Sequence, residues 1–179
     1  MRLERGDLVG CDIHTRVEYY TTINGEKKWI DGDHYKRNKY FGDNEDEVEL
    51  NVVSIYDDRN YTLFSILAGV RGCEDMINEP RGLPFDTNKF IKGEFERWGA
   101  SIHTASWFTL KELMDYQDTL LEASLDRDVR LEECEDETKA LIPLIENLKI
   151  RCKELFWLWD EYRIAEFAHK IRVVFWFDN

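Results

Sequence analysis

Residues 171–178 limit the possible folds of this chain more than any other stretch. They read IRVVFWFD, an almost unbroken run of apolar, β-branched and aromatic side chains. Such a strand is stable only when both of its faces are covered, because neither face offers a row of polar groups to water. The run therefore predicts a central strand with packed layers on both sides.

A second strand is predicted from Cys11 to Tyr20, where polar and apolar residues alternate. Asp12 and His14 lie on its polar face. Asn24-Gly25 follows, and this pair favours a tight hairpin because both residues tolerate positive φ. With strands near both ends and helical patterns between them, we expect an α+β fold. Its small mixed or antiparallel sheet has the first and last strands at the centre, packed against several helices.

The other predicted elements follow from periodicity and capping residues. Asp57 or Asp58 is expected to cap a first helix, and Asp86 a second helix with Phe90 facing inward. Thr109 and Glu112 match the capping box of a third helix. The remaining predictions are a surface loop at 32–46, a strand at about 48–56 and a long helix at 140–169.

Length and charge exclude several classes of function. The 179 residues suit a single domain, 1–179, and 37 acidic against 24 basic residues give a net charge of −13. This field repels nucleic-acid backbones and anionic membranes, and no stretch approaches the roughly 18 apolar residues of a membrane span. The four cysteines lack metal-ligand spacing and suit free, mostly buried thiols of a reducing compartment. We therefore expect a cytoplasmic protein that binds neither extended nucleic acid nor membranes.

Several arginines are candidate anion ligands. Arg59-Asn60 stand at a predicted helix start, where free N–H groups and the helix dipole favour anions. Arg71 follows that helix, and Arg81 lies in a loop stiffened by prolines at 80 and 84. Each arginine has a structural alternative, such as pairing of Arg81 with Glu79.

A third group of polar residues lies between 101 and 107. Trp107 suits stacking on a base or filling the core, and His103 suits a ligand or a structural histidine; Ser106 lies between them. Asp12 and His14 likewise suit metal binding, acid–base work or a plain polar strand edge. The sequence contains no phosphate-binding glycine loop, nucleophile elbow or zinc-protease motif.

Five motifs together resemble a family of small phage and prophage proteins that have no assigned function. They are GCDIH at 10–14, DRNYxLF at 58–64, EPRGLP at 79–84, HTASW with TL at 103–110, and VVFWFDN at 173–179. The resemblance implies a bacterial host. Small phage proteins without enzyme motifs are often counter-defence factors, and some of these sequester nucleotide signals.

Three functions follow as expectations. The first is a sponge for a small nucleotide-derived anion that needs no cofactor. In it, Arg59, Arg71 and Arg81 neutralise phosphates, Trp107 or a nearby tyrosine stacks on a base, and Asp12, His14 and His103 contact polar edges. Asn60 and Ser106 are further candidate ligand-binding residues. The second is a metal-dependent hydrolase or phosphodiesterase using Asp12, His14, His103 and Asp178. The third is direct inhibition of a host defence protein, and the apolar helix stripe with Trp157 and Trp159 also allows a homo-oligomer.

Overall fold

The structure is a computed structural model, and it describes residues 12–38, 50–70, 76–125 and 131–178. Its centre is β6 (Ile171–Asp178), which lies in a four-stranded sheet of order β2-β1-β6-β5. Both neighbours of β6 are antiparallel to it, and residues 171–177 are all buried. The predicted central strand, and its pairing with the first strand, are therefore confirmed.

The remaining strands and helices follow the chain in a simple order. They are β1 (Asp12–Ile23), β2 (Glu26–Asp31), β3 (His34–Arg37), β4 (Leu50–Val53), α1 (Tyr61–Ala68), α2 (Lys89–Trp98), β5 (Ile102–Thr109), α3 (Leu110–Leu125), α4 (Leu131–Phe156) and α5 (Ile164–Phe167). Short 3-10 turns precede β5 and flank α5.

The hairpin between β1 and β2 forms at the predicted position. Asn24 and Gly25 have φ values of 54° and 83°, as a tight turn with two left-handed residues requires. Ile23 and Glu26 are the last pair before the turn. The dipeptide thus sets the register of this edge of the sheet.

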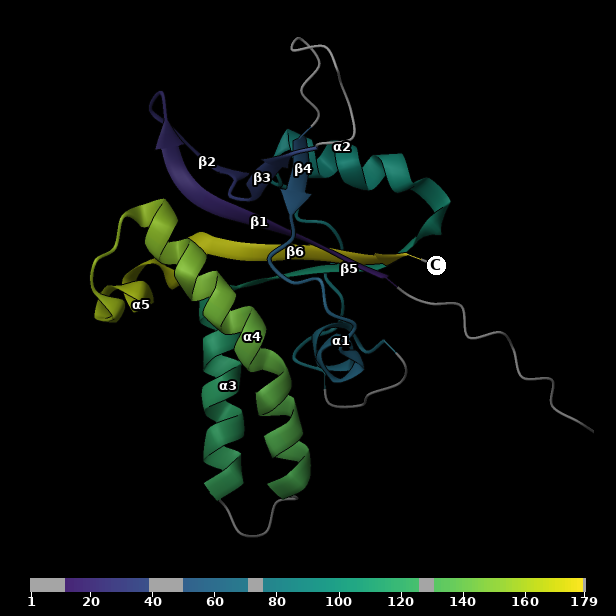
Figure 1. Ribbon diagram of the computed structural model, residues 1–179, viewed down its shortest axis with the longest axis vertical. Coiled ribbons are helices and arrows are strands. Elements are labelled where there is room, and N and C mark those ends of the chain that lie inside the picture. Colours follow the sequence, from purple (N-terminus) through teal and green to yellow (C-terminus); the bar gives the residue numbers. More distant parts are fainter. Residues whose placement is uncertain (1–11, 39–49, 71–75, 126–130, 179) are drawn as a thin grey trace, which may run out of the picture.

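Helices cover the two faces of the sheet unequally. Figure 1 shows α2 on one side and α1, α3 and much of α4 on the other. The larger core lies on the α1–α3–α4 side, where Phe64, Phe108, Leu148 and Phe175 are fully buried. A smaller apolar cluster under α2 contains Ile91, Val174 and Trp176. The α+β class is confirmed.

The predicted loop at 32–46 is interrupted by a strand. Residues His34–Arg37 form β3, which pairs with β4 in a separate two-stranded sheet, and residues 39–46 lie outside the described ones. The strand predicted at about 48–56 is β4, which is shorter, at Leu50–Val53, and pairs with β3 outside the main sheet. Pattern alone does not say which partner a short strand finds.

Two of the predicted helix caps are wrong, and one is confirmed. Asn60 caps α1 and Asn88 caps α2, so neither Asp57, Asp58 nor Asp86 has this role. Phe90, expected to face inward, is 76% exposed, whereas the next residue, Ile91, is 2% exposed and faces the sheet side. Thr109 and Glu112 do form the reciprocal capping box, each side chain accepting from the other's backbone N–H.

The long helix is displaced toward the N-terminus relative to the predicted 140–169. It runs from Leu131 to Phe156 and contains Pro143. Trp157 ends it with a φ of 53°, while the Leu158 N–H donates to Lys153 O. Trp157 and Trp159 are 81% and 95% exposed, so neither belongs to the core.

The prediction of free, buried thiols can be compared with the structure at one cysteine, Cys152. Cys152 is a free, buried thiol on α4, as predicted, and burial raises its pKa to about 11. The side chains of Cys11, Cys73 and Cys134 lie outside the described residues.

A buried ion pair joins the two central strands. Glu18 of β1 and Arg172 of β6 are opposite each other in the register, and Arg172 Nε lies 2.7 Å from Glu18 Oε2. Their side chains are 0% and 2% exposed. Glu18 Oε1 also accepts from the Asn88 N–H and side chain, which anchors the start of α2.

Removing one member of this pair should destabilise the fold strongly. We expect Glu18→Ala to lower the free energy of unfolding by about 3–5 kcal/mol, because it removes the buried partner of the Arg172 charge and leaves only the partly exposed Asp86 beside it. Urea denaturation measures the loss. The double variant Glu18→Ala/Arg172→Met should recover most of it, and a single-variant loss below about 1 kcal/mol would contradict this account.

Candidate functional site

The polar face of β1 lies under α2. Glu18 is opposite Arg172, and His14 is opposite Trp176. Arg16, between them, is buried and grips Glu94 of α2 through two guanidinium nitrogens. This face therefore combines charged pairs with aromatic rings, and it contains several of the predicted site residues.

Asp12 and Arg59 meet at the end of this face. They form an ion pair in which both side chains are more than half exposed. Asn60, the next residue, uses its side-chain oxygen to accept from the Leu63 N–H as the cap of α1. Arg59 and Asn60 thus have structural partners, and Arg71 lies outside the described residues.

His14 sits between two indole rings. Its ring centroid is 4.5 Å from that of Trp98 and 5.6 Å from that of Trp176. His14 Nε2 lies 3.2 Å from Asp178 Oδ2 but without hydrogen-bond geometry. The contact is therefore an ion pair only while the imidazole is protonated.

His103 does not join His14. A register shift in β5 places His103 opposite Phe177 and Ser106 opposite Phe175, with Thr104 in the left-handed region at φ 54°. The His103 ring stacks on Phe177, so it lies on the α1–α3–α4 side of the sheet. The structure therefore does not bring Asp12, His14 and His103 together as the predicted metal set requires.

No other metal set replaces it in the part of the chain that the structure describes, where no three histidine, cysteine, aspartate or glutamate side chains are grouped to hold an ion.

Ser106 and Trp107 are consecutive residues of β5, so their side chains lie on opposite faces of the sheet. Ser106 is fully buried, and its hydroxyl accepts from the Arg81 N–H, which holds the 80–84 loop against β5. Trp107 is opposite Val174 and faces the α2 side. Of the predicted ligand residues that the structure describes, Trp107 and Arg81 line a common cavity.

That cavity is an open cleft of about 450 Å³, lined by residues of β2, β5, β6 and the 81–86 loop. We call it the Trp–Arg cleft. Its lining residues are Trp29, Arg81, Leu83, Pro84, Phe85, Asp86, Trp107, Thr109 and Arg172.

Arg172 is the most unusual group in the Trp–Arg cleft. Its guanidinium carbon lies 3.9 Å from the ring centroid of Trp29 and 5.2 Å from that of Trp107. Nη2 lies 2.9 Å from Asp86 Oδ1, yet it makes no hydrogen bond with any described group. A buried donor that is left without a hydrogen bond is costly, so the Nη2 N–H groups can donate to an anionic ligand that replaces Asp86.

Arg81 supplies a second cation. Its Nη1 lies 2.8 Å from Glu112 Oε1 and donates to the Trp107 carbonyl at 3.3 Å. Its guanidinium carbon also lies 4.8 Å from the Trp107 ring centroid. The structural partner of Arg81 is thus Glu112 and not Glu79. With five donors, an arginine held in this way still has N–H groups for a ligand.

Phe85 stands at the rim of the Trp–Arg cleft with its side chain fully exposed. It follows Pro84, which is buried and anchors the loop. An exposed aromatic ring beside two arginines and two indoles suits a flat ring with an attached anionic group. This is the chemistry that the site offers.

Sequence reasoning missed Trp29, Phe85 and Arg172. Arg172 had a recognisable sign, because it is the one charged residue within IRVVFWF. A charge inside a strand covered on both faces must be paired, and paired buried charges often mark sites. Trp29 and Phe85 carry no such sign.

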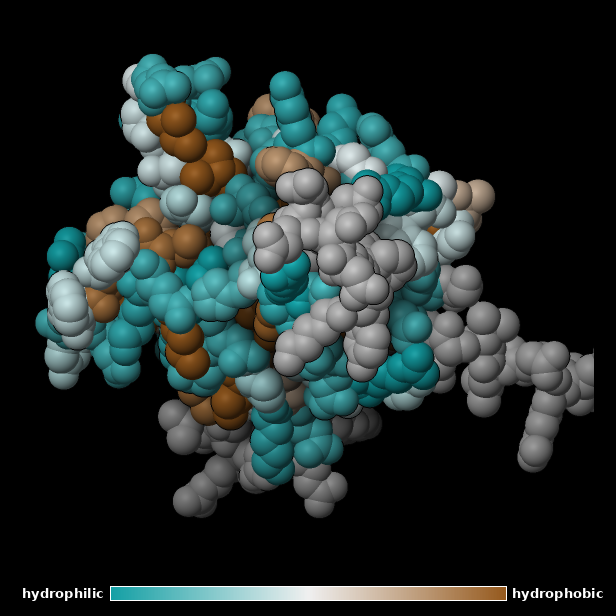
Figure 2. All heavy atoms as spheres, turned by 45° about the horizontal axis from the view of Figure 1, so that its top comes forward, coloured by the Kyte–Doolittle hydropathy of each residue, from teal (hydrophilic) through white to brown (hydrophobic). Residues whose placement is uncertain are grey.

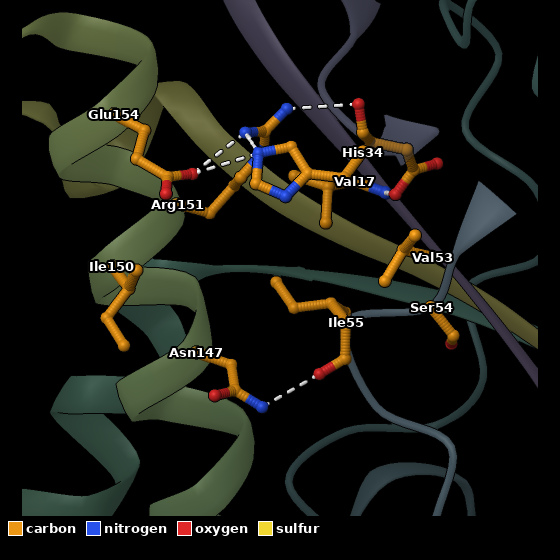
Figure 3. Close-up of a pocket in the computed structure, with 10 residues that line it drawn as sticks. Val17, His34, Val53, Ser54, Ile55, Asn147, Ile150, Arg151 and Glu154 are labelled. Carbon is orange, nitrogen blue, oxygen red and sulfur yellow. Dashed lines mark hydrogen bonds and ion pairs between the residues drawn. The ribbon is translucent and has the colours of Figure 1, made fainter. Parts of the chain in front are cut away.

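A second cavity, of about 220 Å³, lies between β3–β4 and α4 (Figure 3). Its lining residues are Val17, Asp33, His34, Val53, Ser54, Ile55, Asn147, Ile150, Arg151 and Glu154. Asp33 is 8% exposed; its Oδ1 accepts from the Val17 N–H, and its Oδ2 has no hydrogen-bond partner among the described residues. Burial raises the pKa of Asp33 to about 7.

Comparison with known proteins yields no relative. No family model, curated protein or solved structure matches this chain. Among the described residues, no helix has both the length and the apolar character needed to cross a bilayer.

A substitution at Phe85 should alter the Trp–Arg cleft without altering the stability of the fold. We expect Phe85→Ser to change the free energy of unfolding by less than about 0.5 kcal/mol, because the ring is fully exposed. Trp107→Ala should cost several times more, since that ring packs with Ile91 and Trp176. Thermal denaturation of both variants measures the difference. Equal losses would show that Phe85 has a structural role.

Asp33 should make stability depend on pH. Its pKa is raised on folding from 3.8 to about 7, so the folded state holds a proton that the unfolded state releases. This contribution lowers stability as pH rises through that window and is constant above it. Relative to the wild type, Asp33→Asn should gain up to roughly 3 kcal/mol between pH 5 and pH 8. Urea denaturation at both pH values tests this, and a parallel shift of both proteins would contradict it.

Proposed function

We propose that this protein binds a small nucleotide-like anion in the Trp–Arg cleft and holds it without chemical change. The observation that carries the proposal is the buried Arg172 guanidinium, which lies between Trp29 and Trp107. Its Nη2 is 2.9 Å from the Asp86 carboxylate and makes no hydrogen bond to any residue that the structure describes.

Two features of the Trp–Arg cleft support a ligand with both a ring and an anionic group. Trp107 and the exposed Phe85 offer aromatic surface, on which a base gains about 1–3 kcal/mol by stacking. Arg81 and Arg172 offer forked donors that match the geometry of a phosphate. The cleft volume of about 450 Å³ lies within the range of small-molecule sites.

Asp86 would be displaced by such a ligand. Its carboxylate lies 2.9 Å from Arg172 Nη2, and its side chain is 38% exposed. In the free protein it partly neutralises the buried cation, and an incoming phosphate would take the same place. Binding therefore requires the Asp86 side chain to swing outward, which its exposure allows.

The biological role that we propose is sequestration of a nucleotide signal. It rests on the resemblance of the chain to small phage proteins and on the class of counter-defence factors among them. The hydrolase alternative requires Asp12, His14 and His103 in one place, and the geometry does not support it.

Isothermal titration with AMP, ADP-ribose and a cyclic dinucleotide tests the proposal, with adenosine as the probe without phosphate. We expect at least one phosphate-bearing probe to bind and adenosine to bind at least tenfold more weakly. Protein denatured after incubation should release that probe unaltered, as mass spectrometry would show. Failure of all three probes to bind, or release of a cleaved product, would overturn the proposal.

Three variants in the Trp–Arg cleft should change the affinity for the same probe, two of them lowering it and one raising it. Arg81→Gln and Phe85→Ser should weaken binding about tenfold each, because they remove a phosphate donor and a stacking surface. Asp86→Asn should strengthen it several-fold, since the competing charge is lost. Arg163→Gln, at an exposed arginine beside α5, is the matched control and should have no effect.

A further inference from the structure

Three aromatic side chains between α4 and α5 lie almost entirely in solvent. Trp157, Trp159 and Tyr162 are 81%, 95% and 90% exposed. Figure 1 shows that the segment carrying them lies at an outer edge of the molecule. Aromatic rings contribute strongly to the energetics of interfaces, and exposed apolar surface of several hundred Å² marks sites of association. The three rings, which we call the aromatic patch, are therefore a candidate interface.

The backbone beneath the aromatic patch is held in place. Leu158, between the two tryptophans, is buried, and its N–H donates to Lys153 O at 2.9 Å. Asp160 Oδ1 accepts from the Tyr162 N–H at 3.0 Å, and Lys153 Nζ lies 2.9 Å from Glu161 Oε1. A surface that is ordered before association loses less conformational entropy when it binds. The exposed rings thus stand on an anchored segment.

Two hollows adjoin the aromatic patch. Trp157, Leu158 and Trp159 help to line one of about 400 Å³, and Tyr162 helps to line another of about 390 Å³. Lys153 lines both, so the hollows are neighbours. The patch thus combines projecting rings with hollows, which a surface needs if it is to pack against its own copy.

Trp157 occupies a backbone conformation that its side chain disfavours. Its φ of 53° lies in the left-handed region, where glycine is the usual residue after a helix. A bulky residue in this region costs free energy, and the exposed ring recovers none of it by burial within the chain. Burial of the ring against a partner would offset this cost.

The charges around the aromatic patch are balanced. Residues 146–166 carry four basic and five acidic side chains, a net charge of −1, whereas the whole chain carries −13. All four bases pair with acids of the same segment, in the pairs Lys149–Glu146, Arg151–Glu154, Lys153–Glu161 and Arg163–Glu166. Such a surface neither attracts a strongly basic partner nor strongly repels a second copy of this acidic chain.

We propose that the aromatic patch is the interface of a two-fold symmetric dimer, in which the patch of one copy packs against the same patch of the other. An aromatic side chain buries about 150–250 Å², so the three rings of both copies together account for roughly 1,000 Å². A specific interface buries about 1,200–2,000 Å², and flanking side chains such as Ile150, which is 55% exposed, supply the remainder. The dimer does not depend on the Trp–Arg cleft, which shares no lining residue with either hollow.

Analytical ultracentrifugation of the full chain tests the dimer. We expect a reversible monomer–dimer equilibrium with a micromolar dissociation constant, because the interface is at the lower end of the standard size. Trp159→Ser should raise this constant at least tenfold, since tryptophans at the centre of an interface dominate its affinity. Phe90→Ser removes another exposed ring, from α2, and is the matched control that should leave the constant unchanged. A wild-type chain that stays monomeric throughout the micromolar range, assembly beyond two copies, or equal effects of the two variants would overturn the proposal.

Trp157→Gly distinguishes a role in the interface from a role in the fold. Glycine adopts a φ of 53° without strain, so the monomeric variant should melt at the same temperature as the monomeric wild type or above it. Melting is measured below the dissociation constant, where dimerisation adds no stability. The same variant should raise the dissociation constant at least tenfold, because one ring of the patch is lost. An unchanged dissociation constant would refute the place of Trp157 in the interface.

Discussion

The ion pair between Glu18 and Arg172 is the interaction on which much of the structure depends. It joins the two central strands at a fixed register, and its carboxylate also accepts from Thr87 and Asn88. Asn88 in turn caps α2 through the N–H groups of Phe90 and Ile91. One buried carboxylate thus determines where α2 begins and how the 84–88 loop approaches the sheet.

The same pair explains why the candidate site lies on the α2 face. Burying a charge is costly unless the charge is paired, and a nearly buried arginine beside two indoles is held rigidly. The opposite face carries the larger apolar core, in which Phe64, Phe175 and Phe177 are fully buried. Figure 2 shows that hydrophobic residues on the drawn surface occur in small groups between hydrophilic ones. Charge and aromatic surface, and not one large apolar patch, therefore distinguish the proposed site.

Two cavities offer different chemistry to small molecules. The Trp–Arg cleft is lined by arginines and aromatic rings, whereas the cavity beside α4 is lined by aliphatic side chains together with residues such as Asn147, Arg151 and Glu154. They lie on different faces of the sheet and are lined by different residues, so each can be tested without disturbing the other. Arg151, which closes one end of the second cavity, binds the backbone at Gly32 and Asp33 and so fixes the segment between β2 and β3.

Sequence by itself determined the features that depend on local pattern. The run at 171–178, the Asn24-Gly25 turn and the Thr109–Glu112 capping box act over a few residues, so they were predictable. The tertiary structure alone decided which residues share a site. The bulge at Thr104 places His103 and Trp107 on opposite faces, although simple alternation puts them on the same one. The tertiary structure also places Asp86 beside Arg172 and not at the predicted cap of α2. A buried cation attracts a nearby carboxylate more strongly than a helix end does.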